Sequence, residues 1–186
     1  SLAKSIIGIE EISGGSVYIG DQNLSSLGRL EKSAIIQMIF QDPYNSLNPR
    51  KKAWELIGAP LIIQGKYSKE TIYKKSIETM ELVGLPKESA EKFPHMFSGG
   101  QRQRIGIARA LITKPKVVIC DEPVSALDVS IQAQIINLLK RLQKELGITY
   151  IFIGHDLSVI QYIADKIAVM YLGKVVESGE VNNVFS

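Results

Sequence analysis

The chain has 186 residues, 45% hydrophobic and 22% charged, a balance typical of one soluble globular domain, which excludes a disordered chain. Lysine and arginine number 22 against 19 aspartates and glutamates, and because this net charge of +3 is spread along the chain, it does not indicate a nucleic-acid partner. The single cysteine, Cys120, excludes an internal disulfide and indicates a reducing compartment, and no apolar run approaches the roughly 20 residues that span a bilayer.

The first 42 residues are predicted to alternate between short elements and turns. Leu2, Ile6 and Ile7 have the spacing of one helix face, and because this segment starts at residue 1 without a capping residue, we expect the chain to begin inside an element. A turn, a short strand, a largely polar connection and a second strand are predicted to follow, at residues 13–15, 17–19, 23–30 and 35–40.

Residues 43–112 change in character and are predicted to form a helical insert. Two helices are expected at 53–64 and 68–83, and prolines punctuate the loops around them. A third, amphipathic helix is expected to begin after Ser98.

From residue 113 onward the pattern is that of a parallel sheet. Two short apolar runs, 117–120 and 149–153, are separated by a long amphipathic segment, and Gly147 is placed to end that segment. A crossover helix between two buried strands implies a parallel βαβ unit. The last part of the chain is predicted to contain an N-cap with its helix and a two-stranded hairpin, at Asp156, 157–164, and 167–171 with 175–177.

Polar residues follow three of the predicted strands directly. Gln41 follows the first of them, Asp121 and Glu122 follow the second, and His155 comes just after the third. Because ligands of parallel α/β sheets bind beyond the carboxyl ends of the strands, these four are candidate site residues. Adjacent carboxylates can divide the work of phosphoryl chemistry, since one can hold Mg²⁺ while the next orients or deprotonates the attacking water. Taken singly, the two carboxylates also fit a polar turn, and His155 also fits a surface or cap residue.

The run Ser98-Gly99-Gly100-Gln101 opens the third helix of the insert. A serine cap followed by two glycines lets backbone N–H groups and the helix dipole approach an anion closely. An ordinary N-cap turn is the alternative interpretation of these four residues.

Four motifs occur in a fixed order along the chain: Ser98 to Arg104, Val117 to Pro123, Ser125 to Asp128, and Gly154 to Asp156. This series closely resembles the ABC ATPase family, in which these are the signature motif, the Walker B strand with its following glutamate, the D-loop and the switch histidine. The resemblance covers essentially the whole chain, and Phe97 stands where the family often has leucine.

The resemblance implies an α/β fold of the P-loop NTPase (RecA-like) type. Residues 1–42 and 113–186 would form the parallel-sheet core, and 43–112 would be the inserted α-helical subdomain that carries the signature motif.

The resemblance also implies ATP hydrolysis with Mg²⁺. Gln41 would be the Q-loop glutamine, which in the family touches Mg²⁺ and the attacking water. Asp121 would hold Mg²⁺ through water, Glu122 would act on the attacking water, and His155 would steady the γ-phosphate.

Two such subunits would close head to tail on two ATP molecules. Ser98, Gly99, Gly100 and Gln101 of one subunit would cover the γ-phosphate bound to the other, and Asp128 would bridge the two sites. Hydrolysis would then depend on closure of the pair.

Residues 40–50, Phe-Gln-Asp-Pro-Tyr-Asn-Ser-Leu-Asn-Pro-Arg, resemble the Q-loop of oligopeptide, dipeptide and nickel importers in particular. This implies a subunit at the cytoplasmic face of the membrane. Its partners would be a second ABC ATPase subunit, identical or different, and integral-membrane permease subunits. A solute-binding protein would be an indirect partner, and no nucleic acid is expected. A soluble ABC ATPase of DNA repair or translation, and an importer of nickel or another solute, are the alternatives.

The phosphate-binding loop of the family has no counterpart in the chain, because neither Gly-Lys-Ser nor Gly-Lys-Thr occurs in it. In the family this Walker A loop would stand directly before Leu2, so the first strand and the loop are expected to be missing. We therefore expect ATPase activity of the intact subunit, and expect the 186 residues by themselves to bind ATP weakly or not at all and to be inactive.

Overall fold

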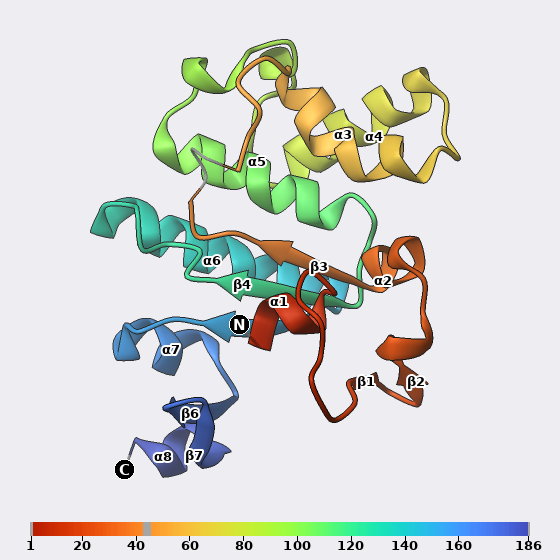
Figure 1. The fold of residues 1–186 in the computed structure, drawn as a ribbon. Helices are drawn as coiled ribbons and strands as arrows, with labels where there is room; N and C mark the ends of the chain where they lie inside the picture. The colour runs from red at the N-terminus through yellow and green to blue at the C-terminus, as the bar shows by residue number, and fades with distance from the viewer. Residues whose placement is uncertain (1, 43–45, 186) are drawn as a thin grey trace.

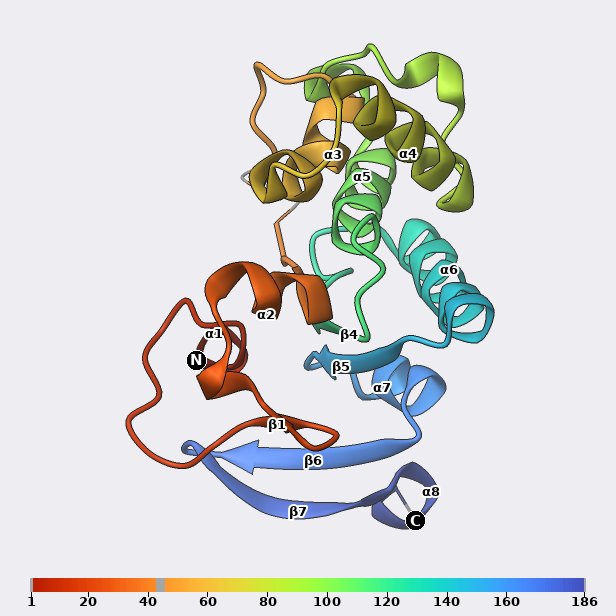
Figure 2. The ribbon, with the colours of Figure 1, turned by 90° about the vertical axis from the view of Figure 1, so that its right-hand side faces the viewer.

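The computed structural model describes residues 2–42 and 46–185, and its centre is a parallel sheet with the strand order β3-β4-β5 (Figure 1). A layer formed by α3, α4 and α5 lies on one side of this sheet. The β6–β7 hairpin and α8 lie at the opposite end of the molecule, as Figure 2 shows from the side.

The helices are α1 (Leu2–Ile6), α2 (Arg29–Ile35), α3 (Ala53–Gln64), α4 (Lys69–Leu82), α5 (Gly99–Leu111), α6 (Val129–Leu146), α7 (Leu157–Ile163) and α8 (Val181–Val184). The strands are β1 (Tyr18–Ile19), β2 (Gln22–Asn23), β3 (Ile36–Ile39), β4 (Val117–Asp121), β5 (Thr149–Ile153), β6 (Lys166–Tyr171) and β7 (Lys174–Glu180). Short 3₁₀ helices lie at Leu24–Ser26, Lys87–Ser89 and Pro94–Met96.

Strand β4 is buried on both of its faces. Val118 and Cys120 pack into the larger hydrophobic cluster, which includes residues of α3, α5 and α6, while Val117 and Ile119 pack on the other face in a cluster with Ala3 of α1. Successive side chains of a strand point to opposite faces, so a strand covered on both sides reads as an unbroken apolar run. The predicted buried strand is thereby confirmed.

The predicted βαβ unit is confirmed by the register of the sheet. In β4, Val117 pairs with Ile36 of β3 and Thr149 of β5, and both pairings are parallel. Helix α6 connects β4 to β5, so the carboxyl ends of the three strands lie at one edge of the sheet.

The predicted end of α6 and the predicted start of α7 are confirmed by their caps. Gly147 ends α6 in the left-handed conformation, at φ 64°, which only glycine adopts without a steric cost. Asp156 begins α7, because its carboxylate accepts hydrogen bonds from the backbone N–H groups of Ser158 and Val159.

The helices α3 and α4 lie where they were predicted and pack very closely at one point. A Cβ added to Gly58 of α3 would lie 2.5 Å from Cγ2 of Ile72 and 3.0 Å from the hydroxyl of Ser76, both on α4. Any larger residue at this position would force the two helices apart.

The prediction of a polar connection over 23–30 was wrong. This stretch contains the end of β2, a 3₁₀ turn and the start of α2. The Asn23 side chain caps the 3₁₀ turn by accepting from Ser25 N–H at 2.9 Å, and Glu31 Oε2 accepts from Gly28 N–H at 2.8 Å at the start of α2. Helix α2 has no buried residue, so hydrophobic periodicity gives no signal for it. Its last residue, Ile35, lies in the helix and not in the strand predicted at 35–40.

The C-terminal hairpin is confirmed, with strands longer than predicted. Strands β6 and β7 pair antiparallel through a turn at Leu172 and Gly173, both of which have positive φ. Among the described residues, the structure has no helix with the length and apolarity needed to cross a membrane.

Candidate functional site

Three of the predicted site residues meet at the carboxyl edge of the sheet. Gln41 Nε2 donates to Glu122 Oε2 at 2.6 Å, and His155 Nδ1 lies 3.2 Å from Glu122 Oε1. The three side chains come from the segments that follow β3, β4 and β5, respectively. The parallel register of these strands brings them together although they are far apart in the sequence.

The backbone at Glu122 is in an unusual conformation that its neighbours hold. Its φ is 45°, in the left-handed region that residues other than glycine rarely occupy, at a cost of order 1–3 kcal/mol. Its N–H donates to Ile153 O at 2.9 Å, and its carbonyl accepts from the Ser125 hydroxyl at 3.1 Å. These hydrogen bonds fix the backbone on both sides of the Glu122 side chain.

The side chains of this group are accessible to solvent to different degrees. The Glu122 side chain is 27% exposed and that of His155 is 74% exposed. An exposed ion pair of this kind contributes only about 0–1 kcal/mol to stability even when the histidine is protonated. Fold stability therefore gives little reason for this arrangement, which leaves chemistry as its better explanation.

Asp121 is the last residue of β4 and lies opposite Ile153 of β5. It is half-buried, and it forms no ion pair with any residue that the structure describes. Within residues 2–42 and 46–185, no three His, Cys, Asp or Glu side chains are grouped so that they could hold a metal ion by themselves. Mg²⁺ in phosphoryl-transfer sites is commonly held by one or two carboxylates together with phosphate oxygens, and Asp121 fits that smaller requirement.

A hollow of about 90 Å³ lies beside Glu122 and His155. It is lined by Glu122, Pro123, Val124, Ser125, Gln132, Phe152, Ile153, Gly154, His155, Asp156 and Val159. Its walls come from the end of β5, the segments after β4 and β5, and the first turns of α6 and α7.

The run Ser98 to Gln101 forms the first turn of α5. Ser98 Oγ accepts from Gln101 N–H at 3.3 Å, and Ser98 N–H donates to Gln101 Oε1 at 3.0 Å, so the two residues form a reciprocal capping box. Both side chains are exposed, whereas Gly99 is half-buried and Gly100 is buried. No hydrogen bond between described residues joins this turn to the group around Glu122.

Gly100 has a packing role that the sequence did not reveal. A Cβ at this position would lie 2.6 Å from Cγ2 of Ile131 on α6. The first turn of α5 therefore lies directly against the first turn of α6, and glycine is required by that close approach.

Asp128 is the N-cap of α6. Its Oδ1 accepts from Ile131 N–H at 3.0 Å, and the residue is exposed. One turn later, Gln132 Nε2 donates to the carbonyls of Val124 and Leu127. Gln132 was not predicted as a site residue. Its position in the first turn of a helix that follows a candidate loop could have indicated it.

Arg109 of α5 was also missed. Its Nη1 donates to Ser46 O at 2.7 Å, which ties α5 to the chain segment after Gln41, and burial lowers the pKa of the Arg109 guanidinium. The Q-loop prediction for 40–50 lies partly outside the described residues, since 43–45 are not among them.

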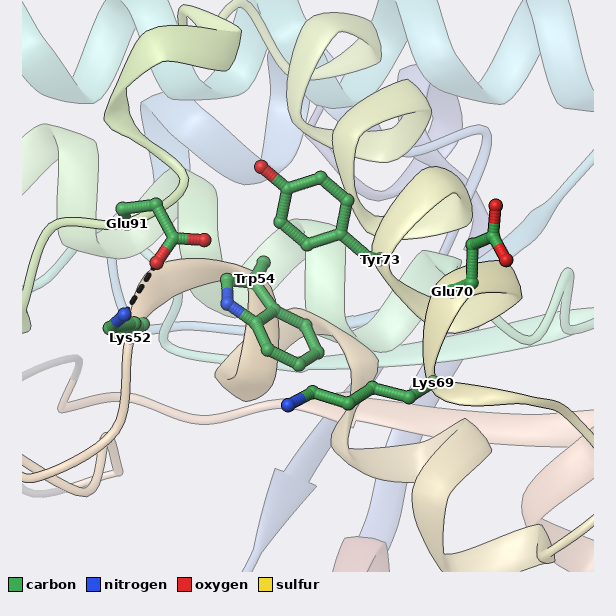
Figure 3. A pocket seen from close by; sticks show the side chains of 6 residues that line it. All are labelled: Lys52, Trp54, Lys69, Glu70, Tyr73 and Glu91. Carbon is green, nitrogen blue, oxygen red and sulfur yellow. Dashed lines mark hydrogen bonds and ion pairs between the residues drawn. The ribbon is translucent and has the colours of Figure 1, made fainter.

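A second, larger hollow of about 500 Å³ lies on the helical layer. Figure 3 shows the side chains that line it: Lys52, Trp54, Lys69, Glu70, Tyr73 and Glu91. The rings of Trp54 and Tyr73 meet edge to face at 5.4 Å, the Lys69 ammonium lies 5.8 Å from the Trp54 ring centroid, and Lys52 pairs with Glu91. This surface combines aromatic area with both signs of charge.

Comparison with known proteins places these motifs in a family. The sequence profile of the ABC transporter family matches residues 1–125. The chain is 49% identical over 190 residues to a dipeptide transport ATP-binding protein of Escherichia coli, covering 100% of the chain and 57% of that protein. It is 51% identical over 188 residues to an oligopeptide transport ATP-binding protein of Bacillus subtilis, covering 98% of the chain and 61% of that protein. The chain thus spans less than two thirds of the length of these relatives.

Solved structures agree with the sequence comparison. The protein cbiO1 of Clostridium perfringens, described as part of the ABC transporter complex cbiONQ, matches with a TM-score of 0.86 at 31% identity, covering 99% of this chain and 73% of that chain. The ATP-binding cassette MJ0796, in a dimeric state bound to ADP and phosphate, matches with a TM-score of 0.80 at 30% identity, covering 97% and 79%. The predicted α/β fold with a parallel-sheet core is thereby confirmed as that of an ABC ATPase cassette. From its motifs, its fold and these relatives, the chain belongs to the ABC transporter family.

Proposed function

We propose that this chain forms part of an ATP-hydrolysing subunit that energises an importer of peptides. The observation that carries the proposal is the position of Glu122, which lies between the Gln41 amide and the His155 imidazole at the carboxyl edge of the sheet. The relatives named as dipeptide and oligopeptide transport proteins support the choice of peptides.

Glu122 is the proposed general base. Its carboxylate would accept a proton from the attacking water while the water oxygen bonds to the γ-phosphorus and the bond from that phosphorus to the bridging oxygen breaks. Gln41, which donates to Oε2, orients the carboxylate, and His155 lies at Oε1, where it can also donate to a phosphate oxygen. Glu122 would thus remove the proton, Gln41 would orient Glu122, and His155 would contact the phosphate, each from the end of a different strand.

Asp121 is the proposed ligand of Mg²⁺, directly or through water, with the Gln41 amide oxygen as a second one. Both groups offer the oxygen ligands that Mg²⁺ prefers. When bound, Mg²⁺ neutralises charge that develops on the phosphate oxygens.

The signature turn is proposed to act on a second subunit. The backbone N–H groups of Gly99 and Gly100 at the start of α5 have no partner within the helix, and the side chains of Ser98 and Gln101 there are exposed. In a head-to-tail pair, this turn with Gly99 and Gly100 would cover the γ-phosphate held by the partner, and the exposed Asp128 would bridge the two sites. The dimeric state of the MJ0796 cassette supports this arrangement.

The membrane partners are proposed to be permease subunits, with this protein at the cytoplasmic face of the membrane. The hollow lined by Trp54 and Tyr73 is a suitable contact surface, because aromatic rings bordered by charges are common at interfaces. The Arg109 bond to Ser46 would pass a movement of the loop after Gln41 to the signature helix. A solute-binding protein would be an indirect partner, and no nucleic acid is proposed.

The same proposal divides the chain into a core and a helical subdomain. Residues 1–42 and 113–186 would be the RecA-like core, and 43–112 the helical subdomain. Support comes from the packing of α3, α4 and α5 into a helical layer on one side of the parallel sheet (Figures 1 and 2).

The experiment is to purify the full-length protein from membranes by an affinity tag and to reconstitute the recovered complex in vesicles. We expect hydrophobic permease subunits to co-purify, and expect Mg²⁺-dependent phosphate release and uptake of a labelled dipeptide to depend on ATP. Recovery with RNA or DNA instead of membrane subunits would point to a non-transport ATPase. ATP-dependent uptake of Ni²⁺ without uptake of dipeptide would contradict the peptide assignment alone.

A further inference from the structure

A single side-chain amide holds the loop between Glu122 and Asp128. Gln132 Nε2 donates to Val124 O at 3.0 Å and to Leu127 O at 3.0 Å. These two carbonyls belong to one turn, which Leu127 N–H closes by donating to Val124 O at 3.1 Å. Because an amide nitrogen has two hydrogens, Gln132 uses its full donor capacity on this loop.

We propose that Gln132 is a positioning residue for ATP hydrolysis, one that fixes the loop on which Glu122 is mounted. This inference rests on the proposed function. Gln132 lines the same hollow as Glu122 and His155, yet its amide donates to the loop carbonyls and not to either of those side chains. Its effect on the reaction is therefore exerted through the loop.

The loop needs an external support because its first residue is strained. Glu122 has a φ of 45°, and a residue other than glycine keeps such a conformation only when its surroundings fix it. On the carbonyl side, Ser125 donates to Glu122 O from its N–H at 3.3 Å and from its hydroxyl at 3.1 Å. Ser125 lies inside the turn that Gln132 holds, so the hydrogen bonds form a continuous path from Gln132 to Glu122.

The support comes from a rigid element. Gln132 lies in the first turn of α6, where its N–H donates to Asp128 O at 2.9 Å, and α6 is 18 residues long and packs along the core. Side chains of a helix lean toward its N-terminus, which aims the Gln132 amide back at the loop that precedes α6. The half-buried location of Gln132 limits competition from water for these two hydrogen bonds.

The test uses four forms of the full-length protein: the unchanged protein, Gln132→Met, Gln132→Lys and Gln134→Met. Methionine has nearly the length and volume of glutamine but donates no hydrogen bond, whereas lysine keeps donors at the end of a long chain. Gln134 lies on the same helix and is exposed, so Gln134→Met controls for the change of residue type.

Two kinds of quantity are measured: kcat and KM for Mg-ATP hydrolysis, and hydrogen–deuterium exchange of the backbone amides of 124–128. We expect Gln132→Met to lower kcat about 10- to 100-fold with little change in KM, since a misplacement of about 1 Å can cost 100-fold. We also expect Gln132→Met to speed exchange in 124–128. Gln132→Lys should recover most of the rate and of the slow exchange, and Gln134→Met should match the unchanged protein.

Faster exchange in Gln132→Met with an unchanged kcat would mean that Gln132 has a structural role only, and would overturn the proposal. Unchanged exchange in Gln132→Met would also overturn it. Equal losses in the methionine and lysine variants would also overturn it, because the donors would then not matter. If the unchanged protein hydrolyses no ATP, the proposed function fails. Exchange would in that case still report whether Gln132 holds the loop.

Discussion

The group around Glu122 and the signature turn differ in the sequence separation of their contacts. Glu122 is reached by Gln41 from 81 residues away and by His155 from 33 residues away, whereas Ser98 and Gln101 are three residues apart and satisfy each other. The first group exists only when the sheet is assembled, and the second forms with one turn of one helix. Changes near Glu122 should therefore alter rate and leave stability nearly unchanged, and changes in the signature turn should alter stability first.

The largest expected effect is on the rate, at Glu122. Glu122→Gln in the full-length protein should lower the hydrolysis rate by about 10²- to 10⁴-fold, because an amide cannot take the proton from water. Nucleotide binding should persist, and the thermal midpoint should change little because the side chain is partly exposed. Phosphate release, nucleotide titration and thermal unfolding measure the three quantities.

Glu177→Gln is the matched control for this change, because Glu177 is exposed on β7 and does not line the hollow beside Glu122. It should leave the rate unchanged. Near-normal hydrolysis by Glu122→Gln would remove Glu122 from the role of base.

A smaller effect, on stability, is expected at the close contact between α5 and α6. Gly100→Ala would place a Cβ 2.6 Å from Cγ2 of Ile131, and such overpacking costs about 1–3 kcal/mol. This outweighs the gain of up to about 1 kcal/mol that alanine brings to a helix. We expect a lower thermal midpoint, which the added change Ile131→Ala should partly restore by removing the clashing methyl group.

Gly106 provides the control on the same helix, because a Cβ there would meet nothing within 4 Å. Gly106→Ala should leave the midpoint unchanged or raise it. If both alanine variants raise it, the two helices do not approach as closely as described.

The smallest effect is expected at the cap of α5. Ser98→Ala removes the hydroxyl that accepts from Gln101 N–H and should cost about 1 kcal/mol, while Ser98→Asn should keep most of the stability because asparagine is an equally good N-cap. Thermal unfolding measures both, with Ser130→Ala as an exposed control. Equal stability of Ser98→Ala and the unchanged protein would mean that the capping box contributes nothing.

Sequence reasoning predicted the parts of the fold that leave a periodic or capped pattern. Strand β4 was recognisable as an apolar run because both of its faces are buried, and the end of α6 was recognisable from Gly147. Helix α2 was missed because it buries nothing, so its residues follow no apolar period. The start of α2 depends on the hydrogen bond from Gly28 N–H to Glu31. In the sequence, Glu31 cannot be distinguished from any charged residue in a loop.

The choice of Gln41, Glu122 and His155 as candidate site residues followed from one rule about parallel strand ends, which needs no knowledge of side-chain conformations, and the structure brings the three together. The supporting contacts were beyond that rule. Gly100 contacts Ile131, and Gln132 contacts the loop, only because two helices and one loop pack together in three dimensions. A glycine or a glutamine in the sequence does not by itself indicate such a role.

The central claim is that Gln41 and Glu122 act as one unit in hydrolysis, and a double-mutant cycle tests it most directly. The rate of phosphate release at saturating Mg-ATP is measured for Gln41→Ala, Glu122→Gln and the double variant of the full-length protein. If Gln41 works mainly by orienting Glu122, its removal alone should slow hydrolysis on the order of tenfold. Once the base is gone, its removal should have a clearly smaller effect, which reflects its part in holding Mg²⁺. A double variant whose loss equals the product of the two single losses would show that the residues act independently, and would contradict the account.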